Sequence, residues 1–324
     1  MSAVAAARAV IAPVPVGAAR PRWSVMIPTF NCARYLRETL ASVLAQDPGP
    51  DRMQIEVVDD ASSDDPAGVV AEVGQGRVAL FRQPVNRGHI LNFATCVDRA
   101  RGEIVHLLHG DDLVLPGFYE ALGRGFEDPA VGAAFCRWQL IDSAGAVTRT
   151  AEAERDRPGR LEDALARLAS EQRIVTPSIA VRRSVWEELG GFDPRLLCAE
   201  DWEMWVRIAA HYPIWYEPAV LAAYRVHDDS NTGRHFRNAE ELRYSRLAIR
   251  LFRHLLPPQR EASIRRSALN AYAQSALANA EAFARNGDRK AMRAHLAAAV
   301  RLRPSPRVLR KAGRIAWQSI RNGL

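Results

Sequence analysis

Short apolar runs alternate with segments of helical spacing between residues 23 and 108, and this alternation constrains the fold more than any other feature. Apolar residues that recur every three or four positions predict helices, whereas short apolar runs that end in turn residues predict buried strands. The predicted strands are residues 23–28, 54–58, 78–81 and 104–108, and the predicted helices between them are residues 33–46, 69–73 and 90–100. Strands that alternate with helices indicate an α/β fold with a mostly parallel sheet.

A polar cluster follows each of these four strands. The clusters are Thr29-Phe30-Asn31, Asp59-Asp60, Asn86-Arg87-Gly88 and His109-Gly110-Asp111-Asp112. Parallel sheets bind their ligands beyond the carboxyl ends of the strands. We therefore expect the four clusters to form one binding site at a single edge of the sheet.

Two neighbouring carboxylates, Asp111 and Asp112, come directly after the fourth strand. They repel each other unless a cation or hydrogen-bond donors compensate their charge. Oxygen ligands favour Mg²⁺ or Mn²⁺, which proteins typically share with substrate phosphates. A solvated turn would be the simpler interpretation of an isolated pair, but the other clusters at the same edge favour a metal site.

Three further side chains near the strand ends have both a functional and a structural interpretation. Asp59 and Asp60 suit a hydrogen bond from a base or a ribose hydroxyl, or a helix cap, although one of residues 62–64 could supply that cap. Phe30 suits either stacking on a base or a place in the core.

Downstream, Glu200-Asp201 opens a predicted helix, where carboxylates often do no more than interact favourably with the helix dipole. The functional alternative is that Asp201 is a general base that takes a proton from an attacking hydroxyl. His227 suits a metal ligand, a phosphate contact or a structural histidine.

The chain changes character after residue 233, where Ala, Leu and Arg dominate and only helical spacing remains. Pro257-Pro258 divides two predicted helices, and residues 268–304 predict a helical hairpin that turns at Asn286-Gly287-Asp288. Between residues 132 and 225 the expected elements are strands at 132–141 and 176–181, helices at 161–170, 184–189 and 199–211, and an extended stretch at 214–225. The expected organisation is a disordered leader at 1–21, an α/β domain at 22–232 and a basic helical region at 233–324.

Charge divides the chain in the same place. Residues 1–232 hold 24 basic and 32 acidic residues, a net charge of −8, whereas residues 233–324 hold 20 basic and 5 acidic residues, a net charge of +15. The basic region therefore suits an anionic surface.

Several protein classes are disfavoured by what the sequence lacks. The four widely spaced cysteines predict neither a disulfide framework nor a zinc ribbon and fit a reducing compartment. The longest apolar runs are too short for a transmembrane helix. The glycine-rich motif of dinucleotide-binding oxidoreductases, the phosphate-binding loop of P-loop enzymes and the serine motif of α/β hydrolases are absent.

The assembled pattern resembles family 2 glycosyltransferases, which have the GT-A nucleotide-diphospho-sugar transferase fold, over about residues 23–232. The motifs that carry the resemblance are Val25-Met26-Ile27-Pro28-Thr29-Phe30-Asn31, Glu56-Val57-Val58-Asp59-Asp60-Ala61-Ser62, Asn86-x-Gly88, Gly110-Asp111-Asp112, Gly190-Gly191-Phe192-Asp193, Glu200-Asp201-Trp202-Glu203-Met204-Trp205-x-Arg207 and Tyr224-Arg225-x-His227. One position departs from the family's D-x-D-D pattern, because His109 stands where the first acidic residue is usual.

This resemblance implies an inverting, metal-dependent transfer of a sugar from a UDP-, GDP- or dTDP-sugar to a hydroxyl of a saccharide or lipid-linked acceptor, in polysaccharide or glycoconjugate biosynthesis. The implied nucleotide-binding residues are Pro28, Phe30, Asn31, Asp59, Asp60, Asn86, Gly88 and Asp111, and the implied ligands of Mg²⁺ or Mn²⁺ are Asp111, Asp112 and His227. Asp201 is the implied base, and the implied neighbours of the acceptor or the phosphates are Glu200, Trp202 and Arg225. The alternative is a non-catalytic nucleotide-sugar-binding or scaffold protein of the same fold.

Residues 308–321 predict an amphipathic helix, in which Leu309, Ala312, Ala316 and Ile320 share one face with Ile315 beside it. A helix of this kind with many cations suits the surface of an anionic membrane, and the alternative is a helix packed on the acidic domain. We expect a cytoplasmic protein, with peripheral contact with the inner face of the membrane through the basic helices as one interpretation, and no nucleic-acid partner.

Overall fold

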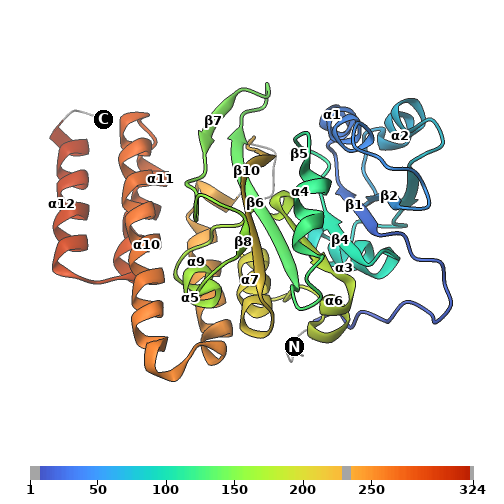
Figure 1. Ribbon diagram of the computed structural model, residues 1–324. Coiled ribbons are helices and arrows are strands. Elements are labelled where there is room, and N and C mark those ends of the chain that lie inside the picture. The colour runs from blue at the N-terminus through green and yellow to red at the C-terminus, as the bar shows by residue number, and fades with distance from the viewer. Residues whose placement is uncertain (1–7, 228–234, 322–324) are drawn as a thin grey trace, which may run out of the picture. The chain divides into compact units, whose positions relative to one another are not determined.

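The computed structural model describes residues 8–227 and 235–321 (Figure 1). The chain divides into two compact units, and the first comprises Met1–Ala164, Ile174–Arg195 and Arg207–Val226. The second unit comprises Leu165–Arg173, Leu196–Val206 and His227–Leu324. This division differs from the single boundary expected at residue 232, because two segments from the earlier part of the chain group with the basic helices.

The first unit contains a ten-stranded mixed sheet whose main strand order is β3-β2-β1-β4-β9-β6-β10-β5, with β7 paired to β6 and β8 to β10. The strands are β1 (Trp23–Thr29), β2 (Met53–Asp59), β3 (Ala79–Arg82), β4 (Ile104–Leu107), β5 (Leu113–Val114), β6 (Ala133–Ile141), β7 (Val147–Thr150), β8 (Gly159–Arg160), β9 (Ile179–Arg182) and β10 (Ile214–Arg225). The first four strands pair in parallel, as do β6 and β10, which confirms the predicted α/β class.

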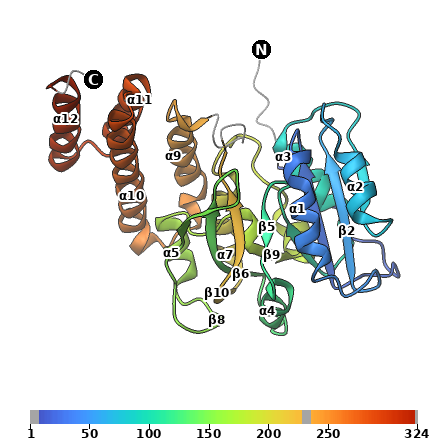
Figure 2. The same cartoon turned by 90° about the horizontal axis from the view of Figure 1, so that it is seen from above.

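Helices connect and cover these strands. The helical elements of the first unit are α1 (Ala33–Leu44), α2 (Pro66–Gly74), α3 (His89–Arg99), α4 (Phe118–Gly125), the 3₁₀ turn η1 (Thr176–Ser178) and α6 (Arg183–Leu189). Figure 2 shows α1, α2 and β2 from a second direction. The order through residue 108 confirms the predicted alternation. The expected strand at 176–181 is instead η1 followed by β9, and α4, β5, β7 and β8 were not expected.

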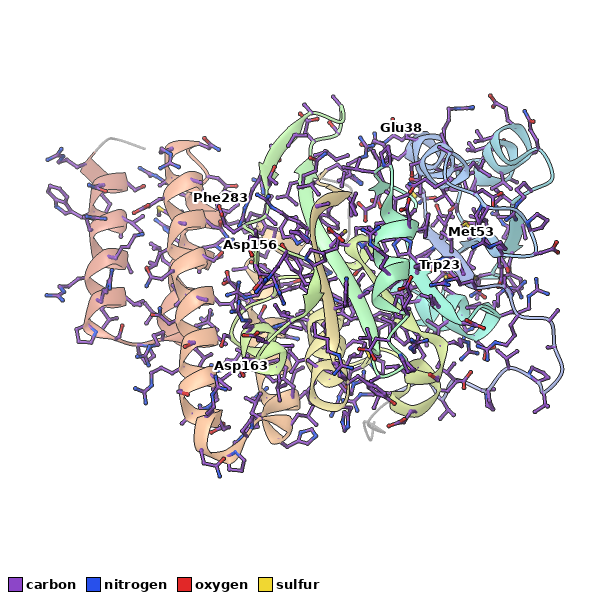
Figure 3. The ribbon with its side chains drawn as sticks, viewed as in Figure 1. Trp23, Glu38, Met53, Asp156, Asp163 and Phe283 are labelled. Carbon is purple, nitrogen blue, oxygen red and sulfur yellow. The ribbon has the colours of Figure 1, made fainter. Side chains whose placement is uncertain are left out.

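The central strand β1 is buried along its whole length. It pairs in parallel with β2 on one side and with β4 on the other, in a register that sets Trp23 opposite Met53 (Figure 3). A strand that is covered on both faces reads as a continuous apolar run rather than an alternating one. This explains why the run at 23–28 was such a clear strand signal.

The N-terminus of α2 illustrates how local chemistry sets an element's boundary. The side chain of Asp65 accepts a hydrogen bond from the backbone N–H of Gly68, and Pro66 takes the first helical position, where its missing N–H has no cost. The sequence left this cap open between the pair Asp59-Asp60 and one of residues 62–64. The structure assigns it to Asp65 instead, and Ser62 donates its hydroxyl to Asp59.

The described part of the expected leader has fixed contacts within the first unit. Ile11 is buried, the carbonyl of Ala9 accepts a hydrogen bond from Gly191, and the carbonyl of Ala12 accepts one from Arg183. Residues 8–21 therefore differ from the disordered leader expected there, and residues 1–7 lie outside the described residues.

The second unit is helical in its described residues. Its elements are most of α5 (Ala164–Ser170), the first half of α7 (Glu200–His211), α9 (Glu240–Phe252), the 3₁₀ turn η2 (Arg253–Leu255), α10 (Pro258–Arg285), α11 (Arg289–Leu302) and α12 (Pro306–Arg321). The predicted hairpin is confirmed: the chain turns at Gly287, whose φ is +76°, and Asp288 caps α11 by accepting the N–H of Ala291 at 3.0 Å. No helix in the described ranges is both long and apolar enough to cross a lipid bilayer.

Candidate functional site

Main-chain hydrogen bonds join the loops at the carboxyl ends of β1, β2 and β4. The backbone N–H of Asp60 donates to the carbonyl of Thr29 at 2.9 Å, and that of Gly110 donates to the carbonyl of the buried Pro28 at 3.0 Å. A Cβ on Gly110 would lie 2.9 Å from Oγ1 of Thr29 and 3.0 Å from Sγ of Cys32, so any side chain here would force these neighbouring atoms to shift. The polar clusters after these strands therefore meet at one edge, as expected.

Asp59 is fully buried, and its carboxylate is held by this chain's own groups. Its Oδ1 accepts hydrogen bonds from the backbone N–H of Ser62 at 3.0 Å and from its hydroxyl at 2.5 Å. Its Oδ2 lies 3.0 Å from Nη1 of Arg82, which is half exposed. In this structure Asp59 therefore binds the protein's own loop, and its contact with a nucleotide stays a prediction.

Asp60 organises the loop that leads into α3. Its Oδ1 accepts the N–H of Arg87 at 2.8 Å and its Oδ2 accepts the N–H of Gly88 at 2.9 Å. The amide of Asn86 also donates to the carbonyl of Asp60 at 3.2 Å. Asp60 is buried and its carboxylate is occupied by backbone donors, so the structure gives it a loop-building role, and its contact with a base stays a prediction.

In the loop after β1, Asn31 is hydrogen-bonded to the neighbouring loop, whereas the side chain of Phe30 is exposed. Asn31 adopts a φ of +52°, its N–H donates to the hydroxyl of Ser62 at 2.9 Å, and its Oδ1 accepts the N–H of Ser63 at 2.7 Å. The side chain of Phe30, by contrast, is 40% exposed. This exposure excludes the core interpretation of Phe30 and leaves its ring accessible for stacking.

Three potential ligands of a cation gather after β4. His109, Asp111 and Asp112 each offer one ligand atom, and these atoms lie within 4.8 Å of one another. Nδ1 of His109 lies 3.1 Å from Oδ2 of Asp112, and its ring stacks on Phe93 with centroids 5.2 Å apart. The histidine at the unusual position therefore joins the acidic pair, which the sequence pattern did not indicate.

The donor set fits a divalent cation. Burial, reinforced by the neighbouring charge of Asp111, raises the pKa of the Asp112 carboxyl above its usual range. A buried carboxylate beside a second carboxylate needs compensating positive charge. The two carboxylates, Asp111 and Asp112, are the ligand type that Mg²⁺ and Mn²⁺ prefer, whereas the imidazole of His109 is not a typical ligand of either ion.

Arg225, at the end of β10, positions this acidic turn. Its backbone N–H donates to Oδ1 of Asp112 at 2.8 Å, and its Nε donates to the carbonyl of Asp111 at 2.9 Å. Its Nη2 donates to Glu38 on α1 at 2.7 Å, and its guanidinium lies 4.6 Å from the centroid of the Tyr35 ring. The Arg225 side chain is only 1% exposed. This placement favours a positioning role over the predicted contact with acceptor or phosphate, because protein groups occupy the guanidinium.

The predicted base lies in the second unit, at the N-terminus of α7. Oδ2 of Asp201 accepts a hydrogen bond from the side-chain amide of Gln172 at 2.7 Å, and Oδ1 accepts the N–H of Trp202 at 2.7 Å. Glu200 is 9% exposed. Gln172 was missed from the sequence, because a single glutamine in a polar loop carries no signal.

Trp202 belongs to the core of the second unit. Its indole N–H donates to the carbonyl of Leu168 at 2.6 Å, and its ring packs against Phe252 and Tyr272 at centroid distances of 5.1 and 5.0 Å. A place beside the acceptor does not agree with this burial. The helical spacing of the tryptophans on α7 was a core signal, and His227, the first residue of the last segment of this unit, stays a predicted ligand.

Comparison with known proteins identifies a family model, glycosyl transferase family 2, that matches residues 24–190. The chain is 32% identical over 225 residues to an uncharacterized protein of Mycobacterium tuberculosis, MT1568, in a match that covers 65% of this chain and 69% of that protein. It is 25% identical over 230 residues to an uncharacterized glycosyltransferase of Rickettsia typhi, RT0329, covering 68% and 69% of the two chains.

Two solved structures share the fold. One is S. aureus TarS 1–349 in complex with UDP-GlcNAc, with a TM-score of 0.66 and 17% identity over 89% of this chain and 82% of that chain. The other is the mannosyltransferase PcManGT from Pyrobaculum calidifontis in complex with GDP-Man and Mn²⁺, with a TM-score of 0.59 and 23% identity over 96% and 83% of the two chains.

Proposed function

Because the chain belongs to glycosyl transferase family 2 and is a glycosyltransferase, we propose that it transfers a sugar from a nucleotide-diphospho-sugar to an acceptor hydroxyl by one displacement, with inversion. The observation that carries the proposal is the convergence of His109, Asp111 and Asp112 at the edge where the loops after β1, β2 and β4 are joined. Solved relatives of the fold bind UDP-GlcNAc and GDP-Man, which supports a donor of this class.

On the donor side, the exposed ring of Phe30 would stack on the base, while Asp59 and Asp60 hold the loops that frame it. Asp111 and Asp112, with His109 beside them and His227 as a further predicted ligand, would hold Mg²⁺ or Mn²⁺. When bound, such a cation neutralises the charge that develops on the leaving diphosphate. Arg225 holds this turn in place, because its Nε donates to the carbonyl of Asp111 and its backbone N–H donates to the carboxylate of Asp112.

On the acceptor side, Asp201 would accept the proton of the hydroxyl as that oxygen attacks the anomeric carbon. The amide of Gln172 fixes the orientation of the carboxylate by donating to Oδ2. We propose a saccharide or a lipid-linked sugar as the acceptor, which would place the enzyme in polysaccharide or glycoconjugate biosynthesis in the cytoplasm.

A thermal-shift screen of UDP-, GDP- and dTDP-sugars, each with and without Mn²⁺, tests donor binding. We expect one nucleotide class to raise the melting temperature of the parent chain only when Mn²⁺ is present. Asp112→Asn should lose this shift and the transfer activity, whereas Asp51→Asn, at an exposed turn residue, should retain both. Full activity of Asp112→Asn, or of the parent in excess chelator, would overturn the metal-dependent mechanism.

Asp201→Asn tests the base separately. The amide preserves the shape of the carboxylate but cannot accept the hydroxyl proton, so kcat should fall about 100-fold or more, with donor binding unchanged. Loss of donor binding together with normal turnover of bound donor would contradict this role. Product anomeric configuration, determined by NMR, decides between inversion and retention.

A further inference from the structure

The helix α12 presents three different faces. Val308, Ala312 and Ile315 are buried in the core that α12 shares with α10 and α11. This corrects the face expected from the sequence, because two of the residues expected on the lipid-facing side, Ala312 and Ile315, are internal. The apolar residues that remain outside are Leu309, Trp317 and Ile320, which are 49%, 57% and 75% exposed.

These exposed residues form one stripe along α12. Positions 309, 313, 317 and 320 follow the helical repeat, so Leu309, Gly313, Trp317 and Ile320 lie on a common outer side, which we name the α12 stripe. Arg310, Arg314 and Arg321 come next to it around the helix, and the guanidinium of Arg321 lies 4.9 Å from the centroid of the Trp317 ring. An apolar stripe with a tryptophan and a flanking row of arginines is typical of helices that lie in a membrane interface.

The charge around the stripe points to one kind of partner. Residues 289–324, which include α11 and α12, hold ten basic residues and no acidic residue. Within the second unit, Glu281 on α10 lies 3.7 Å from both Lys311 and Arg314, at the edge of the range for an ion pair. A symmetric pairing of the α12 stripes of two copies would bring a cationic face against a cationic face, which costs energy. A surface that offers negative charge beside an apolar layer would bind both the apolar stripe and the arginines next to it.

We propose that the α12 stripe docks on an anionic lipid bilayer, with Leu309, Trp317 and Ile320 inserted at the level of the headgroups and the neighbouring arginines in contact with lipid phosphates. The inference does not depend on the transfer reaction, since it rests on α12 alone. It would hold the chain at the surface where a lipid-linked acceptor resides.

Co-sedimentation of the full-length chain with vesicles tests this docking. We expect binding to vesicles of phosphatidylglycerol and phosphatidylcholine, little binding to phosphatidylcholine alone, and weaker binding at high salt. Trp317→Ser with Ile320→Ser removes apolar area without changing charge and should lower the partition coefficient about tenfold or more. Arg310→Glu with Arg314→Glu should lower it at least about fivefold for each cation lost.

Matched controls separate the stripe from general surface effects. Val85→Ser removes an exposed apolar side chain in the first unit, and Arg52→Glu reverses an exposed charge there. Both controls should bind vesicles like the parent chain. Circular dichroism and the melting temperature establish that each variant is folded, which is expected because the altered side chains are exposed.

Three results with vesicles would overturn the proposal. They are equal binding to neutral and anionic vesicles, no binding to either, and stripe variants that bind like the parent. A parent dimer in size-exclusion chromatography that becomes a monomer in Trp317→Ser with Ile320→Ser would assign the stripe to a second copy and would also overturn it. Donor-dependent thermal shifts should be the same in all of these variants, so failure here is distinct from failure of the proposed reaction.

Discussion

Replacing Arg225 should both destabilise the first unit and weaken cation binding, because one side chain does both tasks. Its guanidinium donates to the carbonyls of Asp111 and Asp142, at 2.9 and 3.3 Å, and to the carboxylate of Glu38. Hydrogen bonds from a charged, buried donor contribute about 1.5–3 kcal/mol each. Glu38 is 54% exposed, so solvent screening limits that ion pair to about 1 kcal/mol or less.

From these contributions, Arg225→Ala should lower the free energy of unfolding by about 3–5 kcal/mol, since it also leaves a buried carbonyl without its donor. Arg225→Lys should lower it by about half as much, because an ammonium cannot reproduce the planar fork. Glu38→Gln should lower it by less than about 1 kcal/mol. The loss in free energy of unfolding should therefore decrease from Arg225→Ala to Arg225→Lys to Glu38→Gln, as expected for a guanidinium that is hydrogen-bonded to the acidic turn.

Urea unfolding of the parent and the three variants measures these differences, and calorimetric titration with Mn²⁺ measures the second task. Arg225→Lys, which should stay folded, is expected to bind Mn²⁺ several-fold more weakly, whereas Glu38→Gln should bind it almost as the parent does. If Arg225→Lys retained the parent affinity for Mn²⁺ and Arg225→Ala lost less than about 1 kcal/mol, the positioning role would be refuted.

Three other perturbations test separate parts of the structure. Burial lowers the pKa of the His106 imidazole to about 3, so the folded state keeps this side chain neutral at pH values where the unfolded state protonates it. The resulting stabilisation is complete above pH 6.5 and is lost as the pH falls toward 3, with a loss of about 2 kcal/mol at pH 5. In urea unfolding, the free energy of unfolding of His106→Leu should therefore depend less steeply on pH in acid. Gly110→Ala places a Cβ 2.9 Å from Oγ1 of Thr29 and should cost about 1–3 kcal/mol, measured by the same method; an unchanged midpoint would mean that the loop relaxes freely. Gln172→Ala removes the hydrogen bond to Asp201 and should lower kcat about five- to tenfold with donor KM unchanged; steady-state kinetics would contradict this if only KM moved.

Strand and helix order was predictable where each element has a clear local signal. The run at 23–28 is apolar without alternation because both faces of β1 are buried, and the hairpin turn at Gly287 needs a residue with positive φ. The helix α4 was not predicted from the sequence because it contains two glycines, Gly123 and Gly125, which are poor helix formers. Gly125 packs so closely on Trp215 that a Cβ would lie 2.6 Å from its ring, so tertiary packing decides this helix.

The sequence predicts which residues lie at the candidate site, but it does not predict their hydrogen-bond partners. Asp59, Asp60, Asp111 and Asp112 lie where strand ends predict them, because a parallel sheet fixes which edge they reach. What each carboxylate contacts depends on residues far away in the sequence. Asp112, for example, receives the N–H of a residue 113 positions later. Such long-range pairs leave no periodic or local pattern, which is why the role of Arg225 emerged only from the structure.

The loop frame at the strand ends also indicates where donor choice can be changed by engineering. Asp60 and Asn31 are bonded to neighbouring loops, so substitutions there would alter the frame itself. Phe30, on the loop after β1, and Arg87, on the loop between β3 and α3, have exposed side chains, and only the backbone of Arg87 contributes to the frame. A library confined to these two positions would therefore vary exposed side chains beside the proposed donor site while the hydrogen bonds of the frame stay in place.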